Sequence, residues 1–367
     1  MFLIDSVPFN LQQALDQFPW LQALSHVNQD PHYHGEGDVL THTWMVVDEL
    51  RRLPAWQSLA PAEQSLLLKA ALFHDIGKEP CTKIGDDGRI HAPNHAKVGA
   101  QIVREKMQTL PLQEREMLVQ LVRHHGLPLW FFEKPDPEKA VVGASWQIRL
   151  DWVAMLAEAD VRGRICPDQA ELLERIAYFR QYATELGCYT QPKPFANNHT
   201  RFRYFRSDHL RIDDVLYDDT DFEVIMMSGL PGAGKDTWIS LNHPDLPVVS
   251  LDRIRHERRI PPTANQGEVV RLAKEEAKYL LRRKQPFIWN ATNLTRHLRD
   301  PLVDLFASYG AHVSIVYIDA PLTLLLSRNR NRKQAVPEAT IRKLMQKLEV
   351  PTAEEAHQVR WIENKKA

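Results

Sequence analysis

One glycine-rich stretch, Gly229-Leu-Pro-Gly-Ala-Gly-Lys235, constrains the fold of this chain more than any other feature of its sequence. It follows a short apolar run over residues 222–228 and precedes a segment that we expect to be helical. In this context the spacing GxxxxGK predicts a loop whose backbone N–H groups surround phosphate oxygens, at a helix N-terminus that adds partial positive charge. We therefore expect a nucleotide such as ATP, or another NTP, with Lys235 at its outer phosphates. The expected contacts are Gly229, Pro231, Gly232, Ala233, Gly234, Lys235, Asp236 and Thr237.

The residue after Lys235 departs from the common form of this motif, because Asp236 stands where Ser or Thr normally ligates Mg²⁺. A carboxylate oxygen can also ligate Mg²⁺, directly or through water. The same carboxylate adds negative charge beside a polyphosphate. We expect Mg²⁺ at this site, and the sequence leaves its position relative to Asp236 open.

The second part of the chain alternates short apolar runs with segments of helical periodicity. Expected strands are residues 223–230, 246–252, 286–293 and 312–320, and expected helices are residues 268–284, 296–309, 322–332 and 337–348. Strands that alternate with helices predict a parallel sheet wrapped by helices. The fold class expected for residues 222–367 is therefore an α/β domain with a parallel sheet.

Polar residues follow the ends of the expected strands, where parallel sheets bind their ligands. Asp252 is placed to accept a proton from an acceptor hydroxyl, and Arg255 to hold a nearby phosphate. Asn290 and Asn293 either orient substrate or cap the next helix. A basic segment ends the helix over residues 322–332, and its arginines are expected to close over the nucleotide as a lid. The spacing does not show which of Arg328, Arg330 and Arg332 reaches the phosphates.

Residues 1–190 predict an all-α domain. Apolar residues recur at helical spacing over residues 39–53, 62–73, 96–110, 112–122 and 146–159. Residues 191–221 contain two prolines, an aromatic and basic cluster and an acidic run, and we expect a linker with some structure of its own there. Residues 222–367 carry a charge of +7 and residues 1–221 a charge of −8, which suits phosphorylated substrates and metal binding respectively.

Nine of the 16 histidines lie between His26 and His125, which concentrates imidazole ligands in the first domain. Imidazoles and carboxylates brought together from several helices form sites for divalent metals such as Mn²⁺, Ni²⁺, Co²⁺ or Zn²⁺. Asp75 is expected to bridge two metals. Neighbouring residues of a regular helix cannot both face one direction, so one of His124 and His125 is expected behind the ligands unless the helix ends there, as Gly126 allows. The expected metal ligands are His42, His74, Asp75, His95, His124, His125 and Asp160.

The sequence resembles two known families, one in each half. The segments GLPGAGKDT, LDRIR, NATN and RNRNRKQAVP resemble the P-loop polynucleotide 5'-kinases over about the last 145 residues. That resemblance implies that Asp252 is the general base for a 5'-hydroxyl, that Arg255 contacts the acceptor strand, and that Arg328 and Arg332 contact the donor. The order of the candidate ligands, with HDIGK, NHAKVGA and ADVRGR, resembles the HD phosphohydrolase superfamily over residues 25–165. There Lys78, Arg162 and Arg164 are implied phosphate contacts.

Together the halves resemble the bacterial HD-Pnk family of nucleic-acid end-healing enzymes. This resemblance implies ATP-dependent phosphorylation of a 5'-hydroxyl, and hydrolysis of 2',3'-cyclic, 2'- or 3'-phosphate ends by the HD domain. RNA or DNA ends are the implied substrates, and a nucleic-acid ligase is the implied functional partner.

Two alternatives remain open: a nucleoside or nucleotide kinase fused to a nucleotide phosphohydrolase, and a non-catalytic, ATP-gated nucleic-acid-binding protein. Apolar residues make up 44% and charged residues 25% of the 367 residues, which excludes wholesale disorder. The three cysteines show no paired or CxxC spacing, which argues against a disulfide framework. With no apolar run of membrane-spanning length and no signal-like N-terminus, we expect a cytoplasmic protein with no membrane partner.

Overall fold

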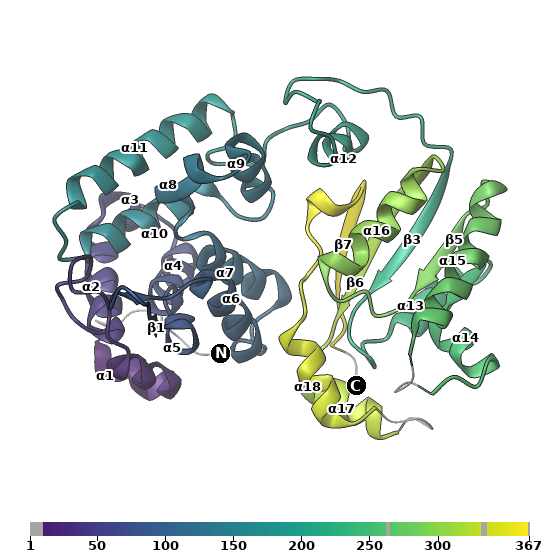
Figure 1. The fold of residues 1–367 in the computed structure, drawn as a ribbon, viewed down its shortest axis with the longest axis horizontal. Coiled ribbons are helices and arrows are strands. Elements are labelled where there is room, and N and C mark those ends of the chain that lie inside the picture. Colours follow the sequence, from purple (N-terminus) through teal and green to yellow (C-terminus); the bar gives the residue numbers. More distant parts are fainter. Residues whose placement is uncertain (1–9, 262–264, 332–335, 366–367) are drawn as a thin grey trace. The chain divides into compact units, whose positions relative to one another are not determined.

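The structure is a computed structural model that describes residues 10–261, 265–331 and 336–365 (Figure 1). Its contacts divide the chain into two compact units, Met1–Pro194 and Phe195–Ala367. The first unit is helical, and the second combines helices with a five-stranded sheet. The expected fold class, an all-α domain followed by an α/β domain with a parallel sheet, is confirmed. Arg332, which we expected at the nucleotide, lies outside the described residues.

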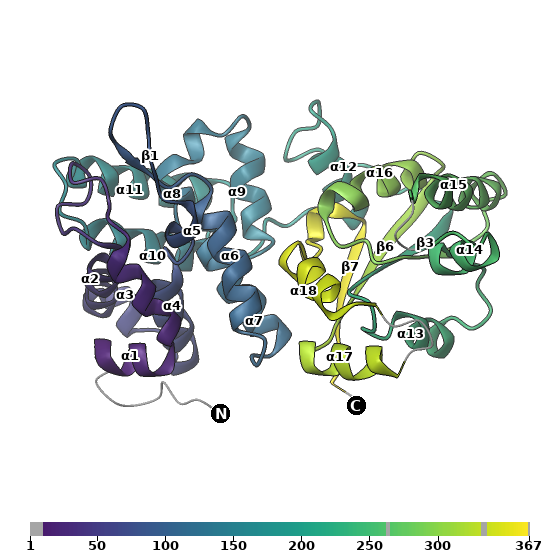
Figure 2. The same ribbon diagram turned by 60° about the horizontal axis from the view of Figure 1, so that its bottom comes forward.

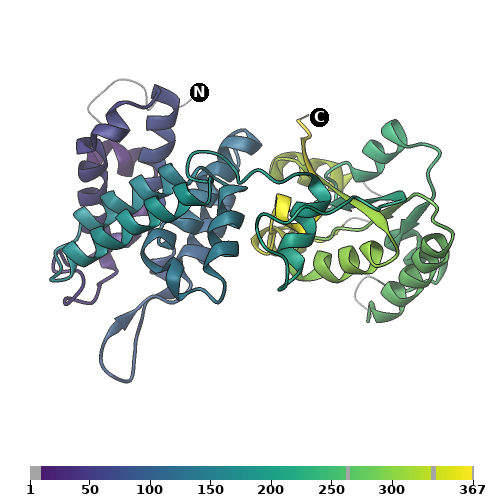
Figure 3. The same cartoon turned by 90° about the horizontal axis from the view of Figure 1, so that it is seen from above.

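Helices make up most of the first unit. Its elements are α1 Leu11–Gln17, η1 Pro19–His26, α2 Val39–Arg52, α3 Pro54–Gln57, α4 Pro61–Phe73, α5 Lys78–Cys81, β1 Lys83–Ile84, β2 Ile90–His91, α6 His95–Lys106, α7 Leu112–His124, α8 Leu127–Trp130, η2 Phe131–Glu133, α9 Pro137–Ser145, α10 Leu150–Arg162 and α11 Gln169–Glu185. The two short strands form an antiparallel hairpin that projects beyond the helices (Figure 3).

Burial explains how the helices of the first unit are arranged. In α10, ten of the 13 residues are buried, so this helix lies inside the bundle and carries Asp160 with it. The start of α2 is set by Asp38, whose side chain accepts a hydrogen bond from Thr41 N–H as a helix N-cap. The expected helix over residues 146–159 is displaced, because Trp146 caps the end of α9 and α10 begins at Leu150.

The second unit is built around a parallel sheet with strand order β4-β5-β3-β6-β7. Helices flank both sides of this sheet (Figure 2). Its elements are α12 Asn198–Arg206, β3 Phe222–Ser228, α13 Lys235–Asn242, β4 Val248–Ser250, α14 Leu251–Glu257, α15 Gly267–Arg282, β5 Phe287–Asn290, α16 Arg296–Ala307, β6 Ala311–Asp319, α17 Leu322–Arg330, α18 Glu338–Gln346, η3 Ala353–Glu355 and β7 Gln358–Glu363.

The strand β3 occupies the centre of the sheet, between β5 and β6. Six of its seven residues are buried, which is typical of a parallel strand covered on both faces. The glycine-rich loop leaves its carboxyl end at the point where the chain connects to opposite sides of the sheet. Ligands of open α/β sheets bind at such a switch point.

The segment expected to be a linker, residues 191–221, holds a helix that belongs to the second unit. Phe202 of α12 is 2% exposed and packs in the same core as Phe222 and Val224 of β3. Arg201 donates a hydrogen bond from Nη2 to the carbonyl of His357 at 2.7 Å. Part of the aromatic and basic cluster of this segment therefore packs in the core of the second unit.

The structure adds a fifth strand, β7, that the periodicity did not predict. It lies at the edge of the sheet, and its residues are partly or fully exposed, so the sequence lacks a buried apolar run there. Within the described residues, the helices are too short or too polar to cross a membrane.

Candidate functional sites

The histidine-rich site of the first unit gathers side chains from five places in the helical bundle. His42 comes from α2, His74 and Asp75 follow α4, His95 begins α6, His125 follows α7, and Asp160 comes from α10. His42, His74, Asp75, His125 and Asp160 are buried, whereas the His95 side chain is 28% exposed. The cluster therefore meets solvent beside His95.

Asp75 divides the cluster into two groups of ligand atoms. Its Oδ2 lies 3.2 Å from His74 Nε2 and 3.7 Å from His42 Nε2. Its Oδ1 lies 3.4 Å from His95 Nε2 and 3.9 Å from His125 Nε2. Each group has the size to hold one metal ion, and the two groups share Asp75. The geometry fits the bridging role expected for this carboxylate.

Backbone hydrogen bonds orient three of the four imidazoles. His74, His95 and His125 each donate from Nδ1 to the carbonyl three residues earlier, at 2.8 Å in each case. This fixes the proton on Nδ1 and leaves the Nε2 lone pair toward Asp75. Among the described residues, His74 Nε2 is buried without a hydrogen-bond partner. A buried lone pair of this kind fits a divalent metal, so the residues present match the metals expected.

Charge compensation keeps the buried carboxylates ionised. Burial raises the pKa of the Asp75 carboxyl, but Lys78 and His74 outweigh burial and hold that pKa well below its usual range. At Asp160 burial acts in the same direction and is outweighed by Arg164 and His42. Burial and the neighbouring His74 and His95 lower the pKa of His125 to about 3, so its imidazole is neutral and able to ligate at neutral pH.

The three residues of this unit that were expected to contact phosphate have different partners in the structure. Lys78 Nζ lies 2.7 Å from Asp75 Oδ2 and donates to Gln29 Oε1 at 2.6 Å, so it lies at the edge of the candidate metal site. Arg164 binds the carboxylate of Asp160 through Nε and Nη2, at 3.0 and 2.5 Å. Arg162 pairs with Glu158 instead. Arg164 therefore holds a candidate ligand in place.

The structure separates His124 from His125, and the expectation that His124 is a ligand is corrected. His124 Nε2 lies 3.2 Å from Gln147 Oε1, whereas His125 Nε2 lies 3.4 Å from His95 Nε2. The two residues are adjacent at the end of α7, where successive side chains point about 100° apart. Only His125 can face Asp75.

This pair offers a matched test of the cluster. We expect His125→Ala to lower the affinity for one of two metals by at least ~10-fold, because it removes a ligand. We expect His124→Ala to leave both metals bound, because it removes only the contact with Gln147. Metal content after dialysis, with melting of the metal-free proteins as a folding check, measures both. Equal loss from the two variants would contradict the placement of His125.

A glycine permits the close approach that brings His95 to Asp75. A Cβ on Gly77 would lie 2.0 Å from the carbonyl oxygen of His95, well inside contact distance. The turn after α4 and the first turn of α6 can therefore touch only because this residue lacks a side chain. The HDIG part of the motif thus serves packing as well as ligation.

The glycine-rich loop of the second unit has the backbone that phosphate binding requires. Gly229, Gly232 and Gly234 all have positive φ angles, of 141°, 83° and 104°. A Cβ on Gly229 would lie 2.5 Å from the Ile318 carbonyl oxygen, so the loop also packs tightly on β6. Lys235 donates from Nζ to the carbonyls of Gly229 and Leu230, at 2.9 and 3.1 Å, which holds it over the loop.

Asp236 contacts a polar residue from the neighbouring strand. Asn290, the last residue of β5, donates from Nδ2 to Asp236 Oδ1 at 2.6 Å. A cavity of about 410 Å³ opens beside this pair and is also lined by Ser240, Ser250 and Arg253. Asn293 has a structural role, because its Nδ2 donates to the carbonyl of Met227 on β3. Of the two candidate asparagines, Asn290 is the one whose side chain contacts Asp236, at the start of the helix after the loop.

Asp252 lies in the first turn of α14, directly after β4, and its side chain is 78% exposed. It forms an ion pair with Arg255, whose Nε donates to Gln266 Oε1 at 2.8 Å. The carboxylate therefore faces solvent at the carboxyl edge of the sheet, with a cation beside it. This position suits a base that meets an incoming hydroxyl.

Of the two candidate lid arginines that the structure describes, Arg328 reaches the loop and Arg330 does not. The Nη1 of Arg328 donates to the carbonyls of Gly232 and Ala233, and its Nη2 to Asn364 Oδ1 at 3.3 Å. Arg330 is exposed at the end of α17. Asn364 also reaches the loop, where its Nδ2 donates to the Ala233 carbonyl at 2.9 Å, although its position in the sequence did not predict this contact. It follows the unpredicted strand β7, so no local signal placed it near the loop.

The fold and these sites define a helical HD domain followed by a P-loop kinase-like domain. A family model described as HD domain matches residues 39–143, and another described as AAA domain matches residues 224–351. The first range contains the candidate ligands from His42 to His125, and the second contains the glycine-rich loop and Arg328. HD domains bind divalent metals, and a P-loop kinase domain uses ATP and Mg²⁺.

Comparison with individual proteins adds a kinase relative. The L-seryl-tRNA(Sec) kinase of Methanococcus maripaludis is 25% identical over 135 residues, which are 35% of this chain. The chain spans about half, 53%, of the length of that relative. Among solved structures, a putative kinase from Chloroflexus aurantiacus matches 39% of this chain and 86% of its own length, with 14% identity and a TM-score of 0.34. A gluconokinase from Sinorhizobium meliloti matches 39% of this chain and 82% of its own length, with 20% identity and a TM-score of 0.28.

Proposed function

We propose that the protein heals broken nucleic-acid ends, as a 5'-hydroxyl polynucleotide kinase and a hydrolase of 2',3'-cyclic, 2'- or 3'-phosphate ends. The observation that carries the proposal is that one chain holds two candidate sites for phosphate chemistry: groups around Asp75 that could hold metal ions and share this carboxylate, and a glycine-rich loop with Asp252 at the same sheet edge. Ribonuclease-type breaks leave a 5'-hydroxyl and a cyclic phosphate. Sealing by a ligase needs a 5'-phosphate and a 3'-hydroxyl, so both activities prepare one break.

In the kinase reaction, Asp252 accepts the proton of the 5'-hydroxyl while the oxygen of that hydroxyl bonds to the γ-phosphorus of ATP. The bond from that phosphorus to the β,γ-bridging oxygen breaks, and ADP leaves. Lys235 and Arg328 lie on the phosphate loop and would balance the charge of the transferred group. Arg255 would hold a phosphate of the acceptor strand beside Asp252.

In the hydrolase reaction, bound divalent metals would supply a water-derived nucleophile at neutral pH and neutralise phosphate oxygens. His42, His74 and Asp75 would hold one metal, and Asp75, His95 and His125 the other. Asp160 would complete the first group, because its Oδ1 lies 3.1 Å from His42 Nε2. Lys78 would contact a phosphate oxygen of the substrate from the edge of the cluster.

The proposed function and the alternative of a nucleoside kinase fused to a nucleotide phosphohydrolase differ in their substrate. The relative from Methanococcus maripaludis is named as a kinase of seryl-tRNA, which favours an acceptor hydroxyl carried by nucleic acid. The basic charge of residues 222–367 favours the same class. A kinase of free nucleosides, fused to a nucleotide phosphohydrolase, needs neither feature.

The test is one oligoribonucleotide with a 5'-hydroxyl and a 2',3'-cyclic phosphate, incubated with ATP, Mg²⁺ and Mn²⁺. We expect a 5'-phosphate and a 3'-end freed of its phosphate, measured by mass spectrometry of both termini. Free nucleosides and nucleoside 2',3'-cyclic phosphates serve as matched small substrates. Faster turnover of the small substrates would favour the nucleotide-metabolism reading, and binding of ATP and RNA without turnover would favour a non-catalytic protein.

A further inference from the structure

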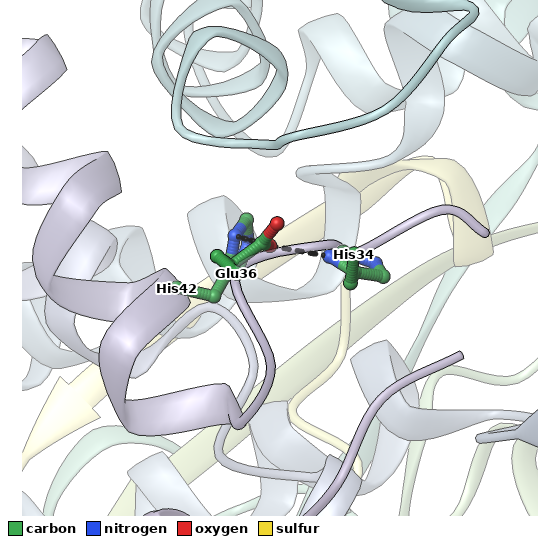
Figure 4. A group of neighbouring side chains, drawn as sticks. All are labelled: His34, Glu36 and His42. Carbon is green, nitrogen blue, oxygen red and sulfur yellow. Dashed lines mark hydrogen bonds and ion pairs between the residues drawn. The ribbon is translucent and has the colours of Figure 1, made fainter. Parts of the chain in front are cut away.

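A buried glutamate outside the candidate ligands sits behind His42. Glu36 lies in the loop before α2, its side chain is 1% exposed, and Figure 4 shows it between His34 and His42. Its Oε1 lies 2.8 Å from His34 Nδ1 and 2.9 Å from His42 Nδ1. Its Oε2 accepts a hydrogen bond from Ile165 N–H at 2.9 Å. Three nitrogen atoms thus converge on one carboxylate.

His42 differs from the other three imidazoles of the metal cluster in how it is oriented. His74, His95 and His125 stand at helix ends and use the carbonyl three residues earlier. His42 lies within α2, where the helix uses the preceding carbonyls for its own hydrogen bonds. The group that faces its Nδ1 is instead the Glu36 carboxylate, at a short distance but outside hydrogen-bond angles.

We propose that Glu36 is a positioning residue for the metal cluster, which holds the proton of His42 on Nδ1 and so turns the Nε2 lone pair toward Asp75 and Asp160. A lone pair on Nδ1 would face a carboxylate oxygen at 2.9 Å, which is repulsive, whereas an N–H there is attracted. The inference rests on the proposed metal-dependent function. Carboxylate partners of this kind raise the basicity of a ligating imidazole as well as fixing its tautomer.

The same carboxylate connects two helices that carry candidate ligands. Ile165 follows Arg164, which holds Asp160 at the end of α10. Two hydrogen bonds join the loop before α2 to this turn. Gly35 N–H donates to the Ile165 carbonyl at 2.8 Å, and Ile165 N–H donates to the Glu36 carboxylate. Glu36 therefore fixes the turn after α10 as well as His42 on α2.

The chemistry of the pocket predicts that an amide cannot replace the carboxylate. The amide of Glu36→Gln has two possible orientations. If its carbonyl oxygen faces the histidines, its NH₂ group faces the Ile165 N–H, and two donors then oppose each other. The flipped amide turns NH₂ toward His42 Nδ1 and favours the tautomer with its proton on Nε2, which removes the lone pair from the cluster. Either orientation weakens the first metal group. Glu36→Asp keeps the charge and is expected to retain more of the affinity.

The experiment measures Mn²⁺ and Co²⁺ dissociation constants of the full chain by competition with a chromogenic chelator, together with the visible Co²⁺ spectrum. We expect Glu36→Gln to bind the metal of the first group ~10–100-fold more weakly and to change the Co²⁺ bands. Glu36→Asp should give values between those of Glu36→Gln and wild type. Glu49→Gln, at a partly buried glutamate of α2 that pairs with Arg52, is the matched control and should behave as wild type. Melting of the metal-free chains, and kinase activity, should agree between Glu36→Gln and Glu49→Gln.

Three results would overturn the inference. Wild-type affinity and an unchanged Co²⁺ spectrum in Glu36→Gln would remove Glu36 from the cluster and leave the proposed function standing. A third metal per chain, lost in both Glu36→Gln and His34→Ala, would show that His34, Glu36 and His42 bind a metal of their own. Absence of metal binding by the wild-type chain would overturn both this inference and the metal-dependent hydrolase.

Discussion

We expect Asp75→Asn to abolish hydrolysis of phosphate ends while 5'-kinase activity stays within twofold of wild type. Asp75 is the residue that both candidate metal groups share, one through each carboxylate oxygen. An amide offers one neutral oxygen and cannot serve both groups. The loss of several kcal/mol of transition-state stabilisation corresponds to a fall of at least ~10³-fold in rate. The measurement follows both termini of the doubly marked oligoribonucleotide.

The control for Asp75→Asn is Asp87→Asn, at an exposed carboxylate of the β1–β2 hairpin in the same unit. It should retain both activities. Thermal melting and metal content separate a folding defect from loss of ligation. If Asp75→Asn is folded and still hydrolyses cyclic phosphate ends at the wild-type rate, the cluster is not the hydrolytic site. If both activities fall together, the two chemistries share one site.

The second large effect concerns phosphoryl transfer. We expect Asp252→Asn to lower kinase turnover by ~10²–10⁴-fold, because an amide cannot accept the proton of the 5'-hydroxyl. ATP affinity should change by less than about threefold, because Asp252 pairs with Arg255 at the start of α14, whereas the phosphate loop is built by residues 229–235. Pre-steady-state phosphorylation and equilibrium binding of a fluorescent ATP analogue measure the two quantities separately.

Two further variants interpret that result. Lys235→Ala should weaken both ATP binding and turnover, because Lys235 belongs to the loop itself. Asp245→Asn, in the exposed turn before β4, should leave both unchanged. Normal turnover in Asp252→Asn would show that another group takes the proton. A fall in ATP affinity equal to that of Lys235→Ala would place Asp252 at the donor instead of the acceptor.

Features whose signals are local were predictable from the sequence. The glycine-rich loop, the buried strand before it and the helix after it each follow from neighbouring residues, because positive φ angles need glycine and a doubly covered strand needs a continuous apolar run. The helices α2 and α4 also agree with their apolar periodicity to within a residue or two. The HD pair and its bridging carboxylate could be proposed for the same reason.

Features that depend on distant partners were not predictable. The strand β7 is an exposed edge that β6 pairs with, and α12 is held by packing on the sheet core. Their own sequences look like a polar tail and a linker, because the apolar surface that stabilises them belongs to other elements. Asn364 was missed because it contacts Ala233, more than a hundred positions away. Glu36 was missed because its place beside its near neighbours His34 and His42 depends on the turn at Ile165, also more than a hundred positions away.

The sequence by itself determined the two-domain fold class, the phosphate loop and the inventory of candidate ligands, because these depend on residue type, period and short spacing. Tertiary structure alone decided which ligands meet. At the end of α7, His125 faces His95, whereas His124 faces Gln147. Arg164 binds Asp160, and Glu36 lies behind His42. A metal cluster is a set of distances between separate helices, and those distances follow from packing of the whole core, which no short segment encodes.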